Sequence, residues 1–195
     1  MTGRRKPWEL RRDARGATIV EFALLAPVLL LTLLGLFDIG YNTYTSSVLQ
    51  GAIVKAARGS TIEGAAPAKL DARVEAAVRD IAPNATVTFD RKSYTSFSDV
   101  GAPEDFTDLD GDGICNNGEP FEDANGNGSW DADRGRSGSG GARDAVLYTV
   151  TVSYPRAFPL AKFIGVSDRH QAQSQTVLRN QPWDEQDTSV KVGNC

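Results

Sequence analysis

The chain has 195 residues, of which 41% are hydrophobic and 24% are charged, enough for one modest domain and an appendage. Its charge is uneven, because residues 1–59 hold eight Lys and Arg against four acidic residues, whereas the remainder holds thirteen against twenty-one. The acidic remainder excludes a nucleic-acid-binding surface there, since phosphate recognition needs clustered positive charge.

The first predicted element is a helix that spans a membrane. The apolar stretch Ala17–Phe37 covers 21 residues if Glu21 is tolerated, close to the roughly 20 residues that cross a hydrocarbon core of about 30 Å. Six basic residues precede the stretch and only two follow it closely, which predicts a cytoplasmic N-terminus and an exported body. Because no small-residue cleavage site follows the stretch, we expect a retained span rather than a secretory signal.

Glu21 stands near the start of this stretch, where an ionisable side chain is costly. One interpretation is that its carboxylate reaches the cytoplasmic interface beside Arg15, or stabilises the helix N-terminus through the dipole. The other is that Glu21 has a function and a charged partner. The residues alone do not decide between the two.

The segment GATIVEFALLAPVLLLTLLGLFDIG, residues 16–40, resembles the N-terminus of TadE-like pseudopilins of the tight-adherence (Flp) pilus system. Precursors of that family resemble type IV prepilins, with a short basic leader ending in glycine and then a hydrophobic helix with Glu at its fifth residue. Counted from Ala17, the fifth residue is Glu21. The resemblance implies cleavage between Gly16 and Ala17 by a prepilin peptidase, and an assembly role for Glu21.

Further along the chain the pattern predicts helices first and strands later. The first helix should continue past Asp38 and end near Gly59, and PAKLDARVEAAVRDIAP, residues 67–83, should form a second helix. Period-two alternation then predicts strands over 85–94, 145–155 and, more weakly, 170–180. The expected fold is α+β and pilin-like, with a membrane-spanning helix that continues as a spine, a second helix, a small antiparallel sheet and an acidic loop insert.

The acidic insert contains DLDGDGICNNGE, residues 108–119, which matches the twelve-residue calcium loop of an EF-hand. Calcium takes 6–8 oxygen ligands, and the glycine at position 6 allows the sharp turn that points alternate side chains inward. The predicted ligands are side-chain oxygens and one backbone carbonyl, from Asp108, Asp110, Asp112, Ile114 (carbonyl), Asn116 and Glu119.

A second copy of the pattern, DANGNGSWDADR, begins fifteen residues later. Its predicted ligands are Asp123, Asn125, Asn127, Ser129 (carbonyl) and Asp131. Position 12 is Arg134 instead of glutamate, so the second site should be weaker than the first. By composition alone the insert would be an unstructured acidic loop. Two spaced copies favour a helix-free pair of calcium loops with a structural role, followed by a flexible return over residues 134–143.

Cys115 and Cys195 are too few for a disulfide scaffold and too far apart for a zinc pattern. They could pair in an oxidising compartment and would be free thiols in a reducing one. No catalytic constellation is visible: the one histidine, His170, lies in the weakest predicted strand, and no phosphate-binding loop is present. We therefore expect no enzyme and no small-molecule substrate.

The tail VLRNQPW, residues 177–183, adds to the resemblance, because TadE-like proteins often close with Arg-Asn-Glu-Pro and an aromatic residue. Gln181 departs from the usual glutamate, and Trp183 is expected to pack on the sheet.

These patterns predict a leader over residues 1–16, a transmembrane helix over 17–40 and a periplasmic domain over 41–195 that carries a calcium-loop insert at 105–134. The expected function is that of a non-enzymatic pseudopilin or minor pilin in the bacterial inner membrane, with other pilins, pilus assembly proteins and the prepilin peptidase as partners. The alternative is a permanently anchored, calcium-dependent binding module outside the cytoplasm.

Overall fold

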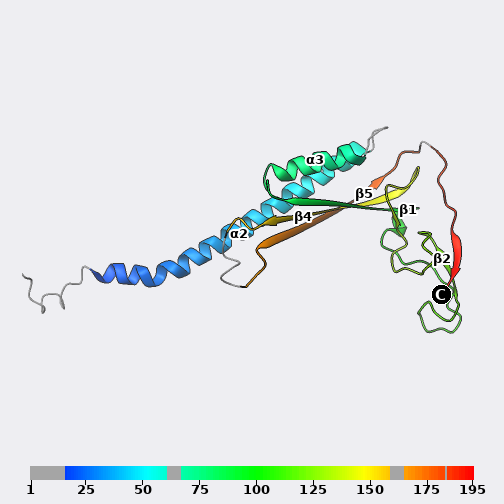
Figure 1. Cartoon of the computed structure of the whole chain (residues 1–195), viewed down its shortest axis with the longest axis horizontal. Helices are drawn as coiled ribbons and strands as arrows, with labels where there is room; N and C mark the ends of the chain where they lie inside the picture. The colour runs from blue at the N-terminus through cyan, green and yellow to red at the C-terminus, as the bar shows by residue number, and fades with distance from the viewer. Residues whose placement is uncertain (1–15, 61–66, 159–164, 183) are drawn as a thin grey trace, which may run out of the picture. The chain divides into compact units, whose positions relative to one another are not determined.

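A computed structural model describes residues 16–60, 67–158, 165–182 and 184–195 (Figure 1). Of the predicted leader, residues 1–16, all but Gly16 lie outside the described residues, as does Trp183. The fold is α+β, as predicted: a long apolar helix is followed by a second helix and antiparallel sheets. The chain divides into two compact units, residues 1–42 with 156–168 and residues 43–155 with 169–195, and each is described separately.

Helix α2 (Ala17–Ser60) has 44 residues and continues through Pro27. It therefore extends past Asp38, as predicted, and ends one residue after Gly59. Large apolar side chains between Ile19 and Ile39 are exposed, as expected for a surface that faces lipid rather than water. Further along the helix, one stripe of side chains is buried: Leu49, Ile53 and Ala56 are each at most 4% exposed.

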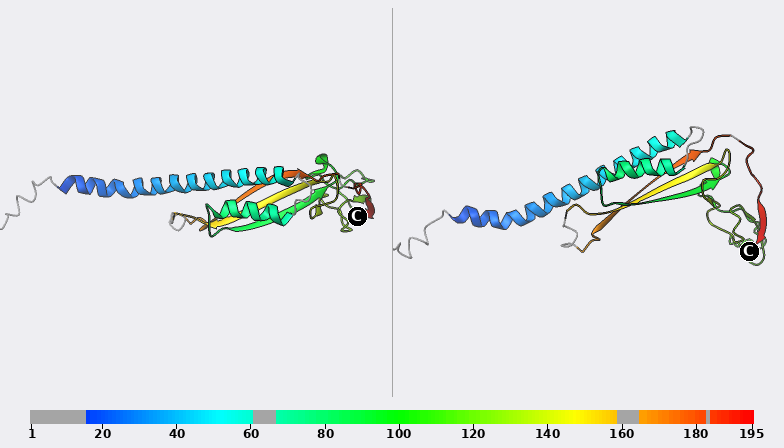
Figure 2. Two further views of the ribbon diagram at one scale, coloured as in Figure 1. Left: turned by 90° about the horizontal axis from the view of Figure 1, so that it is seen from above. Right: turned by 45° about the horizontal axis from the view of Figure 1, so that its top comes forward.

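Helix α3 (Pro67–Arg79) buries one stripe, formed by Leu70, Val74 and Val78. Its apolar residues recur at three- and four-residue spacing, which places them on one face. The helix ends four residues before the predicted end at Pro83, because a residue that precedes proline is disfavoured in the helical region. In Figure 1 and Figure 2, α3 lies beside the C-terminal part of α2.

The main sheet has four antiparallel strands in the order β3-β1-β4-β5. Their bounds are β1 (Thr86–Tyr94), β3 (Arg136–Ser137), β4 (Ala145–Pro155) and β5 (Arg169–Arg179). The three predicted strands are therefore confirmed, and Phe89 of β1 and Ser174 of β5 flank Val150 of β4 in register. The short strand β3 lies within residues 134–143, where the sequence predicted a flexible connection without a strand.

The core lies on one face of this sheet. Alternate residues of β4 point into it and are at most 2% exposed, namely Val146, Tyr148, Val150, Val152 and Tyr154. The Tyr148 hydroxyl donates to Asp71 of α3 at 2.7 Å, and Arg91 of β1 pairs with the same carboxylate at 2.5 Å. Threonines and glutamines occupy much of the opposite face, although Tyr94 and Ala145 at its end near the acidic loops are also buried.

A second sheet has two antiparallel strands, β2 (Pro120–Asp123) and β6 (Lys191–Asn194). The sequence did not predict either strand. They are four residues long and lie about seventy residues apart in the chain, so no hairpin signal joins them. Strand β2 connects the two acidic loops, because it follows the last residue of the first loop, Glu119, and ends at the first residue of the second, Asp123.

Candidate functional site

The predicted processing site lies at the start of α2. The helix begins at Ala17, directly after Gly16, and Glu21 is exposed one turn later among exposed apolar side chains such as Val20 and Phe22. Glu21 is the one charged residue of the described chain before Asp38, and its neighbours along the helix are mostly apolar. Among the described residues, one helical stretch, Ala17–Ala56 of α2, is long and apolar enough to cross a membrane, a property that a signal sequence shares.

Asp38 ends the apolar stretch and is largely buried, with 8% of its surface exposed. Its Oδ2 atom accepts hydrogen bonds from Arg156 and from Asn42 Nδ2, the latter at 3.1 Å. Arg156 also donates through Nε to the Ser167 carbonyl at 3.0 Å. Sequence analysis treated Asp38 only as the end of the span, because its partner Arg156 lies 118 residues away.

The first acidic loop, residues 108–119, brings its carboxylates together. One oxygen from each of Asp108, Asp110 and Asp112 lies within 4.8 Å of the others, so this exposed group could hold a metal ion. Asp108 also accepts hydrogen bonds from the backbone N–H groups of Gly111 and Gly113, at 2.6 and 3.0 Å. Both glycines have positive φ, near 78°, a conformation that residues with a Cβ atom rarely adopt.

The second acidic loop, residues 123–134, repeats this hydrogen bonding position for position. Asp123 accepts from the N–H groups of Gly126 and Gly128, at 2.7 and 3.1 Å, as Asp108 does from its two glycines. Asn125 and Asn127 both donate to Asp131 Oδ2, at 2.8 and 2.6 Å, so these predicted ligands also converge. Ile114 and Ser129, the residues predicted to offer backbone carbonyls, occupy equivalent places, and each donates its N–H to the residue two positions earlier.

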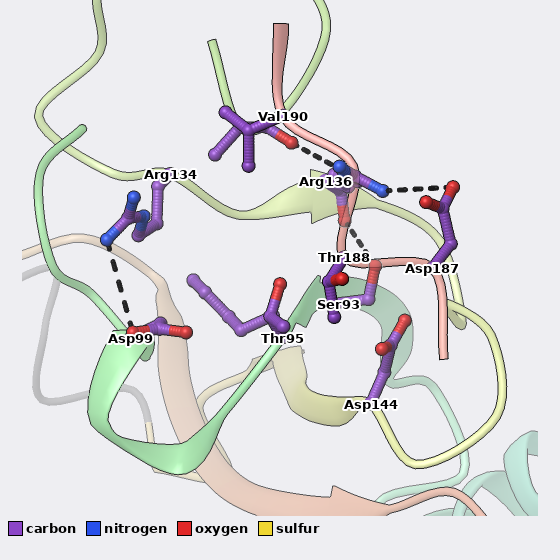
Figure 3. Close-up of a pocket in the computed structure, with 11 residues that line it drawn as sticks. Ser93, Thr95, Asp99, Arg134, Arg136, Asp144, Asp187, Thr188 and Val190 are labelled. Carbon is purple, nitrogen blue, oxygen red and sulfur yellow. Dashed lines mark hydrogen bonds and ion pairs between the residues drawn. The ribbon is translucent and has the colours of Figure 1, made fainter. Parts of the chain in front are cut away.

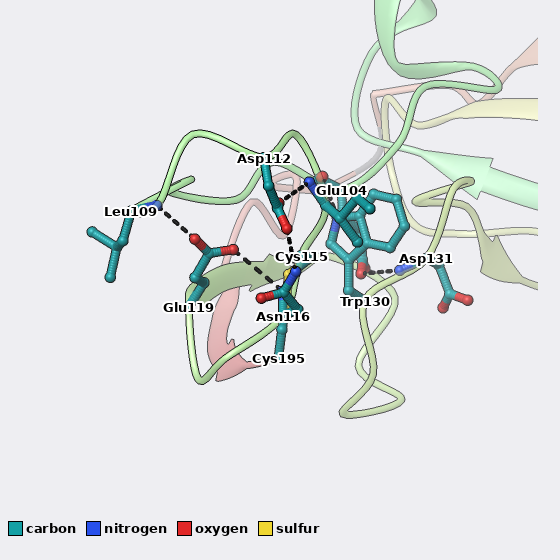
Figure 4. The surroundings of a disulfide bond; sticks show 10 residues. Glu104, Leu109, Asp112, Cys115, Asn116, Glu119, Trp130, Asp131 and Cys195 are labelled. Carbon is teal, nitrogen blue, oxygen red and sulfur yellow. Dashed lines mark hydrogen bonds between the residues drawn. A yellow bond between two sulfur atoms is a disulfide. The ribbon is translucent and has the colours of Figure 1, made fainter.

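Two glutamates accept hydrogen bonds from backbone N–H groups of the loops, and Figure 4 labels both of them. Glu119, the predicted position 12 of the first loop, accepts from the N–H groups of Leu109 and Asn116, at 2.6 and 3.2 Å. In the second loop, Arg134 at position 12 instead pairs with Asp105 at 3.0 Å. Glu104 accepts from three N–H groups of that loop, and sequence analysis missed it.

A short antiparallel bridge joins the two loops. Phe106 and Phe121 are partners in an isolated β-bridge, and the Thr107 N–H donates to the Pro120 carbonyl at 2.9 Å. Trp130 of the second loop packs edge-to-face on Phe106 at 5.8 Å and donates its indole N–H to the Glu104 carbonyl at 2.8 Å. Aromatic contacts and backbone pairing therefore hold the loops in one arrangement without flanking helices, as predicted.

Comparison with known protein families gives one match, to the model described as TadE-like protein, over residues 16–58. Residues 16–58 are a TadE-like domain. No curated protein and no solved structure matches the chain. The TadE-like domain begins at Gly16 and contains Glu21 and Asp38, whereas the acidic loops and both sheets lie outside it.

Outside the TadE-like domain, a disulfide joins Cys115 of the first acidic loop to Cys195. The two Cα atoms are 5.6 Å apart, and the Cys195 N–H donates to the Glu119 carbonyl at 2.8 Å (Figure 4). The disulfide and the β2–β6 pairing thus fasten residues 191–195 to the loop pair. Sequence analysis left the pairing open because it depends on the redox compartment.

A partly exposed polar cluster connects strand β1 with the end of the second loop. Asp133 accepts hydrogen bonds from Lys92 at 2.6 Å and from the Tyr94 hydroxyl at 2.9 Å. Burial and then the bond to Asp133 raise the pKa of Tyr94 to about 12, and the bond to Asp133 raises the pKa of Lys92. Although burial opposes it, the bonds from Lys92 and Tyr94 lower the pKa of Asp133.

These shifts predict a loss of stability at alkaline pH. A raised tyrosine pKa contributes stability that is complete below the unfolded value of about 10 and is lost as pH rises toward about 12. We expect Tyr94→Phe to remove about 2 kcal/mol of this pH-dependent loss, since one pKa unit corresponds to about 1.4 kcal/mol. Urea titrations of the wild type and Tyr94→Phe at pH 8 to 12 give the free energy of unfolding of each protein and so measure this difference. Tyr44→Phe, which replaces an exposed tyrosine, is the control. Parallel pH curves for wild type and Tyr94→Phe contradict the prediction.

A pocket of about 190 Å³ lies between β1, β3 and residues 187–190 (Figure 3). Its two arginines already have partners, because Arg134 approaches Asp99 and Arg136 approaches Asp187, both at 4.0 Å. Arg136 also donates to the carbonyls of Ala124 and Ser189, the latter at 2.9 Å. The pocket therefore joins segments of the domain. Asp144, which also lines it, forms no ion pair in the described chain and accepts hydrogen bonds from the Gly141 N–H at 2.7 Å and from Gln186 at 2.9 Å.

Proposed function

We propose that this protein is a pseudopilin or minor pilin that takes part in assembly of a tight-adherence pilus. The observation that carries the proposal is the TadE-like domain at residues 16–58, which is built on one helix with exposed apolar side chains. TadE-like proteins are pilin-like and generally non-enzymatic, and the proposed role needs no enzymatic activity. Its partners are other pilins, pilus assembly proteins and a prepilin peptidase.

In this proposal residues 17–40 cross the bacterial inner membrane once. Residues 1–16 form a cytoplasmic leader, because six of the chain's basic residues precede the apolar stretch. Residues 41–195 form a periplasmic domain. The periplasm is an oxidising compartment, in which the Cys115–Cys195 disulfide persists.

Cleavage after Gly16 gives Glu21 its role. It removes the basic leader and creates one α-amine at Ala17, about 6 Å along the helix axis from Glu21 at 1.5 Å per residue. A carboxylate and an ammonium are each costly in hydrocarbon when unpaired. If neighbouring helices stack with an axial offset, the amine of one subunit pairs with Glu21 of the next, and this favours one register.

The intact mass of the protein from cells with their native export machinery tests the proposal. We expect a mass that lacks residues 1–16, because a prepilin peptidase cuts between Gly16 and Ala17. A Gly16→Ala variant processed less efficiently would place the cut there. A full-length mass for the wild type contradicts the proposal and favours the alternative, a permanently anchored calcium-dependent binding module.

We further propose that the acidic loops bind calcium, which stabilises the periplasmic domain. Three carboxylates converge within 4.8 Å in the first loop, a donor set of hard oxygens that suits calcium. Asn116 Oδ1, from the predicted position 9, is buried and has no hydrogen-bond partner among the described residues. Extracellular calcium modules bind with dissociation constants of about 10⁻⁴–10⁻³ M, so external calcium suffices.

A further inference from the structure

Two of the most buried side chains of the domain are carboxylates. Glu104 and Glu119 each expose 1% of their surface, although glutamate is rarely this buried without a charged partner. Among the described residues, no Lys or Arg forms an ion pair with either one. Hydrogen bonds from backbone N–H groups stabilise the carboxylates only in part, so each site carries an uncompensated negative charge.

The two glutamates make the same contacts, each with a different loop. Glu119 accepts from positions 2 and 9 of the first loop, Leu109 and Asn116, at 2.6 and 3.2 Å. Glu104 accepts from positions 2 and 9 of the second loop, Ala124 and Asp131, at 2.8 and 3.0 Å. Glu104 therefore holds the place in the second loop that Glu119 holds in the first.

This arrangement arises because the repeat is longer than the calcium loop. Glu104-Asp-Phe-Thr-Asp108 is repeated as Glu119-Pro-Phe-Glu-Asp123, so a glutamate stands four residues before each loop. The bridge between Phe106 and Phe121 places these two segments antiparallel, and Glu122 donates its N–H to the Asp105 carbonyl at 2.8 Å. The glutamate of each segment therefore contacts the loop that follows the other segment: Glu104 contacts the second loop and Glu119 the first.

We infer that the second loop is a complete calcium site, closed by Glu104 in place of the glutamate that its own position 12 lacks. The inference rests on the proposed calcium binding and differs from the expectation from sequence that the second site is the weaker one. Arg134 is used elsewhere, since it pairs with Asp105 and Glu122 on the two bridging segments, at 3.0 and 3.4 Å.

Two observations outside the loop geometry point to a cation. The first is the pair of buried carboxylates, which no cationic side chain of the described chain neutralises. The second is Asn116 Oδ1, a fully buried oxygen with no donor in the described structure. A bound cation would supply what both lack, a positive charge for the carboxylates and a partner for the amide oxygen.

The full chain in detergent micelles, with its disulfide intact, allows each site to be read separately. Calcium titration by calorimetry gives the number of ions. Terbium luminescence excited through tryptophan reports on the second loop, because Trp130 is its position 8, and Trp130→Phe identifies that signal. The variants are Glu104→Gln and the matched control Glu122→Gln, which removes an exposed carboxylate from the same bridge.

We expect the wild type to bind two calcium ions with affinities within about tenfold. Glu104→Gln should lower calcium affinity at the second site at least tenfold and abolish the Trp130-dependent terbium signal, while Glu122→Gln changes either less than threefold. If Glu104→Gln alters the far-UV circular dichroism, Glu104→Asp, which keeps the charge but shortens the side chain, should show the same loss of affinity.

Two calcium ions bound with wild-type affinity by a folded Glu104 variant would overturn the inference and leave calcium binding itself intact. A single calcium ion in the wild type, with no terbium signal that depends on Trp130, would overturn it in the same way. Absence of any calcium binding to the wild type would instead overturn the proposed calcium function, and this inference with it.

Discussion

Withdrawal of calcium should accelerate proteolysis within residues 105–134 at least about a hundredfold. A ligand at about one hundred times its dissociation constant stabilises the bound state by about 2.7 kcal/mol per site. Calcium at about 10 mM reaches this excess if the dissociation constant is near 10⁻⁴ M. Cleavage follows the population of the open loops when opening is fast relative to cutting. Without the ion, the buried carboxylates Glu104 and Glu119 favour opening, because they have no counter-charge in the described chain.

The measurement is a time course of limited proteolysis in calcium and in excess chelator. The gel must be reducing, since the Cys115–Cys195 disulfide keeps fragments together after a cut between those residues. Asp112→Asn should be cut faster than wild type in calcium, whereas Asp90→Asn, on an exposed position of β1, should match wild type. Equal cutting with and without calcium would identify the insert as an ordinary unstructured acidic segment.

The second large effect is on assembly. Glu21→Ala should reduce incorporation into the pilus machinery at least tenfold while leaving membrane insertion unchanged. Removing the carboxylate leaves the α-amine of the neighbouring subunit unpaired in hydrocarbon, at a cost of several kcal/mol. Insertion depends on the long apolar surface between Ile19 and Ile39, which the substitution does not shorten. Co-purification with the assembled pilus, relative to the amount in the membrane fraction, measures the effect.

Two controls separate charge from other causes. Glu21→Gln keeps the shape and hydrogen-bonding capacity but not the charge, so it should lose incorporation nearly as fully as Glu21→Ala. The intact mass of each variant shows whether cleavage after Gly16 still occurs, because an unprocessed variant would fail for a different reason. Normal incorporation of a processed Glu21→Ala protein would leave Glu21 as an interfacial carboxylate without an assembly role.

Regular periodicity made most of the fold predictable. Every second residue of β4 from Val146 to Tyr154 is a buried apolar or aromatic residue, and α3 repeats its apolar residues at helical spacing, so both were predicted from sequence. Strands β2 and β6 were not predicted, because four residues are too few to establish a period. Strand β3 was missed for a related reason: its two residues, Arg136 and Ser137, form a strand only through pairing with β1.

The candidate metal centre was predictable in part. Loop spacing indicated which residues of each loop converge, and the carboxylates of Asp108, Asp110 and Asp112 do lie together. Glu104 was missed because the expected ligand set was read within each twelve-residue loop, whereas Glu104 reaches the second loop from a segment nineteen residues before it. The signal was present as the repeated Glu-x-Phe-x-Asp, but only the antiparallel bridge shows that the two segments exchange their glutamates.

The Cys115–Cys195 disulfide has a mechanical consequence. It closes a covalent ring across 80 residues, and of the strands in the described chain only β1 lies outside that ring. An extended chain spans about 3.4 Å per residue, so the disulfide prevents an extension of about 270 Å when the domain is pulled at points outside the ring. A pull transmitted from α2 to the acidic loops therefore runs through β1 and the segment up to Cys115. Strands β4 and β5 lie within the ring, so such a pull does not extend them while the disulfide is intact.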